Sequence, residues 1–205
     1  MKKIIIAIDS FKGCLTSAEA GKAAEKGIKS INPSCHTSVI PIADGGEGLL
    51  DVLIRATKGK YITLSAHGPL MKMAKTHYGL SGNGRTAIIE MAAISGLPLV
   101  PIEQRNPMLT TTFGTGELIK DALNKGCRNF IIGIGGSATN DAGLGMLQAL
   151  GFRFLDKSGH TLGTGGQIME AVANIDTSGI HPALRETHFM VACDVANPFY
   201  GPDGA

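Results

Sequence analysis

The sequence has 205 residues, 43% of them hydrophobic and 18% charged, and its formal net charge is +2. These values are typical of a globular protein and exclude a chain that is disordered throughout. With no basic stripe and only 5% aromatic residues, the sequence gives no reason to expect a nucleic-acid-binding surface. Glycine is abundant, at 28 residues, and clusters beside apolar runs, which suggests backbone brought close to a ligand.

Cysteine, histidine and apolar patterns point to a cytoplasmic protein without a membrane anchor. The cysteines are widely spaced and form no C-x-x-C pair, which fits reduced thiols in the cytosol. They are Cys14, Cys35, Cys127 and Cys193. No histidines stand in H-x-x-x-H spacing, so a histidine metal site is not expected. The apolar run at residues 4–8 is too short for a signal peptide or a membrane span.

The N-terminal segment is predicted to form a strand, a helix, a second strand and a short helix. Residues 3–8 are a continuous β-branched run, typical of a strand buried on both faces of a parallel sheet. Thr16 and Glu19 stand in capping-box spacing before a helical stretch. A second strand is expected at 36–43, followed by a helix near 48–57. Because such a unit is right-handed, its two strands should be parallel.

After residue 60 the pattern changes to short strand-like segments separated by turn signals. This indicates an antiparallel meander and a domain boundary near residues 60–65. Strands are expected in it at residues 61–67, 71–80 and 85–93. Further along the chain, helices are expected near 115–125 and 142–150, and strands at 130–134 and 189–193. The pattern predicts an α/β fold, with a Rossmann/flavodoxin-like parallel βαβ portion and a second, mixed-sheet α/β domain.

Loops with acidic side chains follow the first two predicted strands. Since those strands should be parallel, the loops at 9–13 and 44–48 should meet at the carboxyl edge of the sheet, where such folds bind ligands. In the first loop, Lys12 could neutralise the charge of a transferring phosphate. Asp9 and Ser10 could hold a metal, a hydroxyl or the lysine. The simpler interpretation is a solvated loop with a surface lysine.

The second loop carries Asp44, Gly45, Gly46 and Glu47. Two carboxylates in a flexible turn suit oxygen-only ligation of Mg²⁺. A helix N-cap by Asp44, with Glu47 at the third helical position, explains the same residues equally well. The two interpretations are compatible.

The segment richest in candidate chemistry lies between a predicted strand and a predicted helix, at residues 133–141. Its glycines let backbone N–H groups turn toward a ligand, and the following helix N-terminus adds positive potential, so phosphate binding is plausible. The candidates are Gly135, Gly136, Ser137, Thr139, Asn140 and Asp141. From Gly133 to Ala138 the sequence also fits a dinucleotide-binding fingerprint, with Asp156 as the ribose-binding acid. A third interpretation is a tight turn capped by Asn140 or Asp141.

Asp194 ends the last predicted strand. A carboxylate in that position could take the proton from an attacking hydroxyl, as a catalytic base does in phosphoryl transfer. A structural Asx-turn is the competing account. The sequence contains neither a Walker A motif nor a protein-kinase Gly-rich loop, which disfavours a P-loop nucleotide site.

Five blocks, in the same order, resemble the glycerate kinase type I family. They are DSFKG (9–13), ADGGEG (43–48), FGTGELI (113–119), GIGGSATNDAGLGMLQALG (133–151) and CDVANPFYGPDGA (193–205). Five blocks are far more specific than any one loop, and the resemblance covers the whole chain. It implies that the protein is a kinase that uses ATP and Mg²⁺ to phosphorylate a hydroxyl of D-glycerate, giving phosphoglycerate. The site would lie in a cleft between two α/β domains.

The resemblance also implies roles for individual residues. Asp194 is expected to activate the glycerate hydroxyl, and Lys12 to stabilise charge on the transferred phosphoryl group. The backbone from Gly135 to Ser137 would contact the substrate carboxylate or a phosphate. Cys14 and Ala142 stand where Ser and Gly are more usual in the family, and both changes are small.

Family members run on well past residue 205, and their first domain is completed by chain from the far C-terminus. Residues 1–62 are therefore expected to be the first part of a discontinuous Rossmann-like domain, and residues 63–205 an incomplete second α/β domain. On its own the chain is expected to have little or no kinase activity.

Two other functions compete with the kinase. One is a nucleotide-dependent oxidoreductase that uses the fingerprint from Gly133 to Ala138. The other is an inactive binding or assembly fragment. The sequence leaves the oligomeric state open, a homodimer included.

Overall fold

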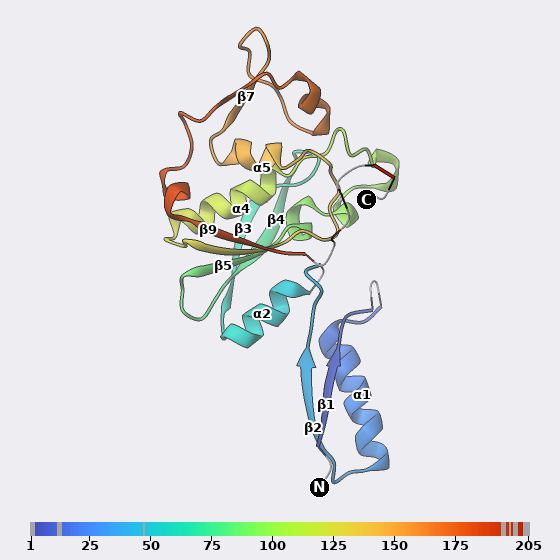
Figure 1. The fold of residues 1–205 in the computed structure, drawn as a ribbon. Helices are drawn as coiled ribbons and strands as arrows, with labels where there is room; N and C mark the ends of the chain where they lie inside the picture. The colour runs from blue at the N-terminus through green and yellow to red at the C-terminus, as the bar shows by residue number, and fades with distance from the viewer. Residues whose placement is uncertain are drawn as a thin grey trace.

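A computed structural model describes residues 3–11, 14–46, 48–193, 196, 198 and 201–202. The chain forms an arm and a larger body (Figure 1). The arm consists of β1 (Lys3–Ile8), α1 (Ser17–Ile31) and β2 (His36–Pro41), and it extends away from the rest of the chain. The body contains the remaining elements.

The arm is the predicted strand–helix–strand unit. Its strands β1 and β2 pair in parallel along their whole length. Helix α1 begins with the predicted capping box, in which the Glu19 N–H donates to Thr16 Oγ1 and the Thr16 N–H donates to the Glu19 carboxylate. Both predictions are confirmed.

Within the described residues, only one face of the two-stranded sheet is covered. Ile6 lies on the face that α1 covers and is 6% exposed. On the other face, Ile5 of β1 is 61% exposed and Ile40 of β2 is 49% exposed. The apolar run of β1 predicts burial on both faces, so the second face is apolar surface without cover in this part of the chain.

The body is built on a five-stranded mixed sheet in the order β3-β4-β5-β6-β9. Its strands are β3 (Lys60–His67), β4 (Met73–Leu80), β5 (Thr86–Glu90), β6 (Asn129–Gly133) and β9 (His188–Ala192). Strands β3, β4 and β5 form the predicted antiparallel meander, whereas β5, β6 and β9 run parallel. The fold class, with a parallel βαβ portion and a second mixed-sheet α/β part, is confirmed.

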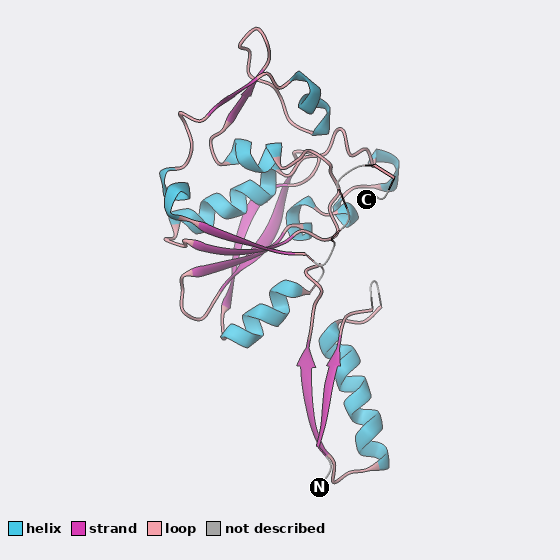
Figure 2. Cartoon of the chain, in the orientation of Figure 1, coloured by secondary structure: helices cyan, strands magenta, loops and turns pink. Residues whose placement is uncertain are grey.

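Helices cover both faces of this sheet (Figure 2). They are α2 (Leu49–Thr57), α4 (Phe113–Asn124) and α5 (Leu144–Ala149). Side-chain alternation along β5 divides the core between them. Ile89 packs in a cluster with Leu118 of α4, while its neighbour Ile88 packs with Leu50 and Ile54 of α2.

Helix α2 belongs by its contacts to the body. It packs against β4 and β5, although it precedes the boundary predicted near residues 60–65. The division into residues 1–62 and 63–205 stays a prediction.

Short elements complete the body. They are α3 (Ala92–Ser95), β7 (Arg153–Leu155), β8 (Asn174–Asp176) and the 3-10 turns Leu97–Leu99, Ile102–Gln104, Gly166–Ala171 and Pro182–Glu186. The strand predicted at 85–93 ends earlier, because the chain turns into α3 directly after Met91.

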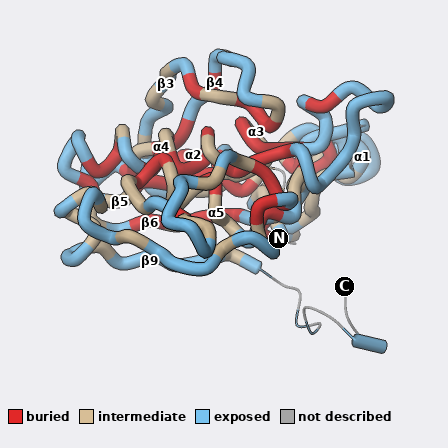
Figure 3. The backbone as a smooth tube through the Cα atoms, turned by 90° about the horizontal axis from the view of Figure 1, so that it is seen from above, coloured by how far each residue is buried: buried red, intermediate tan, exposed pale blue. Residues whose placement is uncertain are grey.

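Burial is concentrated in the centre of the body, and β9 is exposed along the edge of the sheet (Figure 3). Phe189, Met190 and Val191 of β9 are 44%, 66% and 54% exposed. Among the described residues, no helix is both long enough and apolar enough to cross a bilayer.

Candidate functional site

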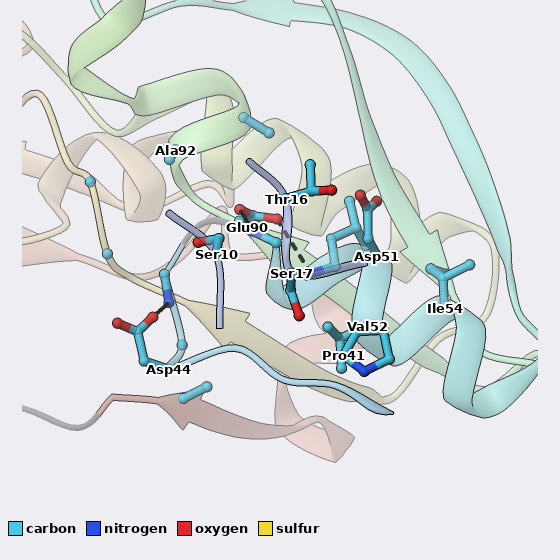
Figure 4. A pocket seen from close by; sticks show the side chains of 18 of the residues that line it. Ser10, Thr16, Ser17, Pro41, Asp44, Asp51, Val52, Ile54, Glu90 and Ala92 are labelled. Atoms are coloured by element: carbon cyan, nitrogen blue, oxygen red, sulfur yellow. Dashed lines mark hydrogen bonds between the residues drawn. The ribbon is translucent and has the colours of Figure 1, made fainter. Parts of the chain in front are cut away.

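A cleft of about 1460 Å³ is lined by both the arm and the body. Its walls come from the loops after β1 and β2, the start of α1, helix α2, and the carboxyl ends of β5, β6 and β9. Figure 4 shows Ser10, Asp44 and Glu90 among the side chains around it, with Asp51 and Val52 of α2. The predicted meeting of the loops after β1 and β2 is therefore found at this cleft.

Ser17 ties the ends of β1 and β2 to the start of α1. Its hydroxyl donates a hydrogen bond to the Ile8 carbonyl at 2.6 Å and accepts one from the Ile42 N–H at 3.0 Å. The side chain is buried, so these bonds are shielded from competing water. The two loops that enter the cleft therefore start from a fixed base.

Each of these loops contains a carboxylate that bonds to its own backbone. The Ser10 N–H donates to Asp9 Oδ1 at 2.6 Å, and the Gly46 N–H donates to Asp44 Oδ1 at 2.9 Å. Ser10, Asp44, Gly45 and Gly46 line the cleft, whereas Asp9 is not among its lining residues.

Three candidates named from the sequence lie outside the described residues: Lys12, Glu47 and Asp194. Phe11, Gly48 and Cys193 all line the cleft. The expected catalytic and metal-binding roles of the three stay predictions.

Three glycines let the loops around the cleft pack backbone against backbone. A Cβ added at Gly45 would lie 2.6 Å from the Ala192 carbonyl oxygen, and one at Gly133 would lie 2.5 Å from the Gly45 carbonyl oxygen. One added at Gly135 would lie 2.7 Å from Cα of Gly46. Since real Cβ atoms do not approach so closely, each of these three positions requires glycine for the contact between backbone segments. The approach to a ligand expected from the sequence stays a prediction.

The loop at 135–141 divides into a part at the cleft and a part used for structure. Gly135 and Gly136 line the cleft. The Ser137 hydroxyl donates to the Thr139 carbonyl at 2.9 Å, and the Thr139 hydroxyl donates to the Thr110 carbonyl at 2.7 Å. Asn140 is exposed. The lining residues of the cleft do not include Ser137, Thr139 or Asn140.

Asp141 is 1% exposed and lies away from the cleft lining. Its carboxylate accepts hydrogen bonds from the N–H groups of Thr112, Gly143 and Gly145, at 2.8, 3.0 and 3.2 Å. The N–H groups at the start of α5, which the sequence analysis considers as a binding site for an anion, thus donate to the Asp141 carboxylate. The arrangement matches the alternative interpretation of a capped turn, and a substrate contact by Asp141 stays a prediction.

The dinucleotide interpretation of this loop is wrong. It requires Asp156 to follow the next parallel strand of the same sheet. Asp156 instead follows β7, which pairs antiparallel with β8 in a separate two-stranded sheet. The ribose-binding acid is therefore not where a dinucleotide would need it.

Glu90 is a lining residue that the sequence analysis missed. It ends β5, and its carboxylate accepts hydrogen bonds from the N–H groups of Gly48, at 2.8 Å, and Leu50, at 3.3 Å. Glu90 lies inside the strand predicted at 85–93, so the signal that singled out Asp9, an acid directly after a buried strand, did not point to it.

At the α2 side of the cleft, Tyr61 and Asp51 form a second polar group. The Tyr61 hydroxyl donates to Asp51 Oδ1 at 2.7 Å, and this hydrogen bond, together with partial burial, raises the pKa of Tyr61 to about 12. The ring of Tyr61 meets His77 edge to face, with centroids 5.5 Å apart. The hydroxyl therefore stays protonated at neutral pH.

The described residues contain no group of three or more His, Cys, Asp or Glu side chains that could hold a metal ion. Asp44 is the candidate metal ligand that lies within the described chain and at the cleft.

Comparison with known proteins gives a consistent result. Residues 4–205 match a family model described as "Glycerate kinase family". The chain is 54% identical to "Glycerate kinase" of Bacillus subtilis and 49% identical to "Glycerate 2-kinase" of Escherichia coli, each over 99% of this chain and 53% of the relative. A crystal structure described as "putative glycerate kinase 2 from Salmonella typhimurium LT2" superposes with a TM-score of 0.86 at 48% identity, covering 100% of this chain and 55% of the other. The chain thus spans about half the length of the curated relatives it matches.

Proposed function

The chain belongs to the glycerate kinase family, and on that basis we propose that the protein carrying it transfers the γ-phosphoryl group of ATP to a hydroxyl of D-glycerate. The observation that carries this proposal is the convergence of five strand ends on one cleft. The carboxyl ends of β1, β2, β5, β6 and β9 all contribute to its walls. Such an edge is where open α/β sheets bind ligands.

The proposed division of labour follows the chemistry of phosphoryl transfer. Asp194 would take the proton of the attacking glycerate hydroxyl, and Lys12 would stabilise charge on the transferred group. The backbone at Gly135 and Gly136, which lines the cleft, would contact a phosphate or the glycerate carboxylate.

We also propose that Asp44 and Glu47 take part in holding Mg²⁺. Asp44 lies at the cleft and presents carboxylate oxygens, the ligands that Mg²⁺ prefers. In kinases one or two carboxylates suffice, because substrate phosphates and water complete the coordination. A bound Mg²⁺ would neutralise charge on the transferring phosphates.

The exposed face of the arm supports the proposal that a further part of the protein is needed to complete the fold. Ile5 and Ile40 are largely exposed there, and the relatives are about twice as long as this chain. We propose that the further part of such a protein covers this face and completes a Rossmann-like first domain, and that residues 1–205 alone have little or no kinase activity. A cytoplasmic location is proposed from the wide spacing of the cysteines, which form no C-x-x-C pair.

The test is ADP release by the full-length protein with ATP, Mg²⁺ and D-glycerate. We expect release well above a glycerate-free blank, with a phosphoglycerate product visible by ³¹P NMR. The position of the phosphorus coupling to the glycerate protons distinguishes the 2-phosphate from the 3-phosphate. No release above the blank would contradict the proposal.

A further inference from the structure

Among the described residues, helix α2 begins at the cleft without a side-chain cap from the residues that adjoin it. Its N-cap residue, Gly48, has a left-handed backbone with φ of 90°, and no side chain of the N-cap bonds to the first turn. A helix N-terminus carries a partial positive charge and unpaired N–H groups. These groups need an acceptor from elsewhere in the fold.

Glu90 provides that acceptor from β5. One carboxylate oxygen accepts from the Gly48 N–H at 2.8 Å and the other from the Leu50 N–H at 3.3 Å. Figure 4 shows the Glu90 side chain at the cleft, close to the start of α2. A negative side chain at this end of a helix is stabilised by the helix dipole as well as by the two bonds.

The backbone of Glu90 is itself held firmly. Its neighbours in β5, Ile88 and Ile89, are 1% and 0% exposed, and β5 pairs with strands on both sides. Directly after it, the Met91 N–H donates to the Gly133 carbonyl at 2.9 Å. A rigid strand end therefore determines where the carboxylate lies, and the carboxylate determines where the 44–48 loop ends.

We propose that Glu90 is a positioning residue for the kinase reaction, which holds the 44–48 loop, and with it Asp44, against the cleft. The expected effect on kcat rests on the proposed function. The effect of Glu90 on the position of the loop does not depend on it. A merely structural helix cap would change stability alone. A positioning residue also changes how well the loop meets the reacting groups.

The experiment uses the full-length protein and compares Glu90→Gln with Tyr78→Phe. Glutamine keeps the length of the side chain but loses its charge and one acceptor oxygen. Tyr78 is buried in the same sheet, donates to Asp121 at 2.8 Å, and is not among the lining residues of the cleft. Its variant is therefore a control for a lost hydrogen bond elsewhere in the body.

Two readouts are needed. Hydrogen exchange of the peptide that contains Gly48 and Leu50 should be at least about fivefold faster in Glu90→Gln than in wild type or Tyr78→Phe, because the amides lose a charged acceptor. The kcat of Glu90→Gln should fall by about tenfold or more. Tyr78→Phe should stay within about twofold of wild type while losing thermal stability.

Two outcomes overturn the proposal. Unchanged exchange at Gly48 and Leu50 would show that Glu90 does not hold the loop. If exchange at Gly48 and Leu50 is faster in Glu90→Gln but its kcat equals that of Tyr78→Phe, Glu90 is only a structural cap of the helix. If wild type itself lacks activity, the proposed function fails first, and exchange alone then decides whether Glu90 holds the loop. Should Glu90→Gln not fold, Glu90→Asp, which keeps the charge but shortens the reach, is assayed in the same way.

Discussion

The carboxylate of Asp141 binds both the backbone N–H and the hydroxyl of Thr112, at 2.8 and 3.0 Å. Thr112 is the residue before α4, and its hydroxyl oxygen also accepts from the Met146 N–H of α5 at 3.0 Å. All of these groups are buried or half-buried. The pair therefore joins the starts of two helices that cover the same face of the sheet.

Replacing Asp141 should cost the protein much of its stability. In Asp141→Ala, the N–H groups of Thr112, Gly143 and Gly145 lose their acceptor inside the protein, which should lower the free energy of unfolding by about 3 kcal/mol. Thr112→Val removes only the hydroxyl and should lower it by about 1 kcal/mol. Urea denaturation followed by far-UV circular dichroism measures both, and a smaller loss in Asp141→Ala than in Thr112→Val would contradict the assignment.

Two glycines in α1 should respond in opposite ways to alanine. At Gly27 a Cβ meets no atom within 4 Å, so Gly27→Ala should stabilise the helix by up to about 1 kcal/mol through its better helix propensity. At Gly21 a Cβ would lie 2.3 Å from Cγ1 of Val39, so Gly21→Ala should destabilise the arm by about 1–3 kcal/mol. Amide exchange of β2 reports both changes, and equal shifts in the two variants would refute the packing argument.

The contact between Gly135 and Gly46 should matter for catalysis. A Cβ at Gly135 would lie 2.7 Å from Cα of Gly46, so Gly135→Ala must push two cleft loops apart. A shift of this size should lower kcat/KM about tenfold to a hundredfold. The matched control is Gly163→Ala, where a Cβ meets nothing within 4 Å. Steady-state kinetics of the full-length protein measure kcat/KM of both variants. Equal values for Gly135→Ala and Gly163→Ala would show that the contact between the loops does not matter for catalysis.

The Tyr61–Asp51 bond should be visible in the titration of Tyr61. Its pKa of about 12 lies above the ordinary value because the bond to Asp51 favours the protonated hydroxyl. A raised folded pKa means that the bond's contribution to stability is full below pH about 10 and disappears as the pH rises toward 12. In Asp51→Asn, the ¹³Cζ resonance of Tyr61 should titrate closer to pH 10. An unchanged midpoint would mean that burial, not Asp51, causes the shift.

Asp194→Asn tests the proposed catalytic base. Loss of a base acts on the chemical step, so kcat should fall far more than KM rises. Assays with saturating ATP and varied D-glycerate give both constants. A kcat close to that of wild type would assign the base to another residue.

The sequence predicted those parts of the fold that depend on neighbouring residues. The β-branched run at 3–8 and the pairing of Thr16 with Glu19 act over a few positions, and the strand and the capping box are both found. The burial of that strand on both faces is not found within the described residues. The fingerprint from Gly133 to Ala138 misled for the same reason, because a local pattern does not say which strand follows in the same sheet.

Contacts between distant segments could not be predicted in this way. The backbone of Gly133 meets that of Gly45, and Glu90 reaches Gly48, although the partners lie far apart in the sequence. Such contacts depend on how the strands are ordered in space and leave no periodic pattern. The sequence therefore found the loops of the candidate site but not the residue that holds one of them.

Within the described residues, the chain crosses from the arm to the body at one place, between β2 and α2. The strands and helix of the arm pack chiefly against one another, while the cleft has one wall on each side of the crossing. A single crossing can act as a hinge, since the walls can change their separation without disturbing either core. Its two ends are anchored differently, by Ser17 at Ile42 on the arm side and by Glu90 at Gly48 on the body side. Within the described residues, a change in the separation of the two walls would therefore fall on the stretch from Ile42 to Gly45, because Gly45 already packs against Ala192 and Gly133.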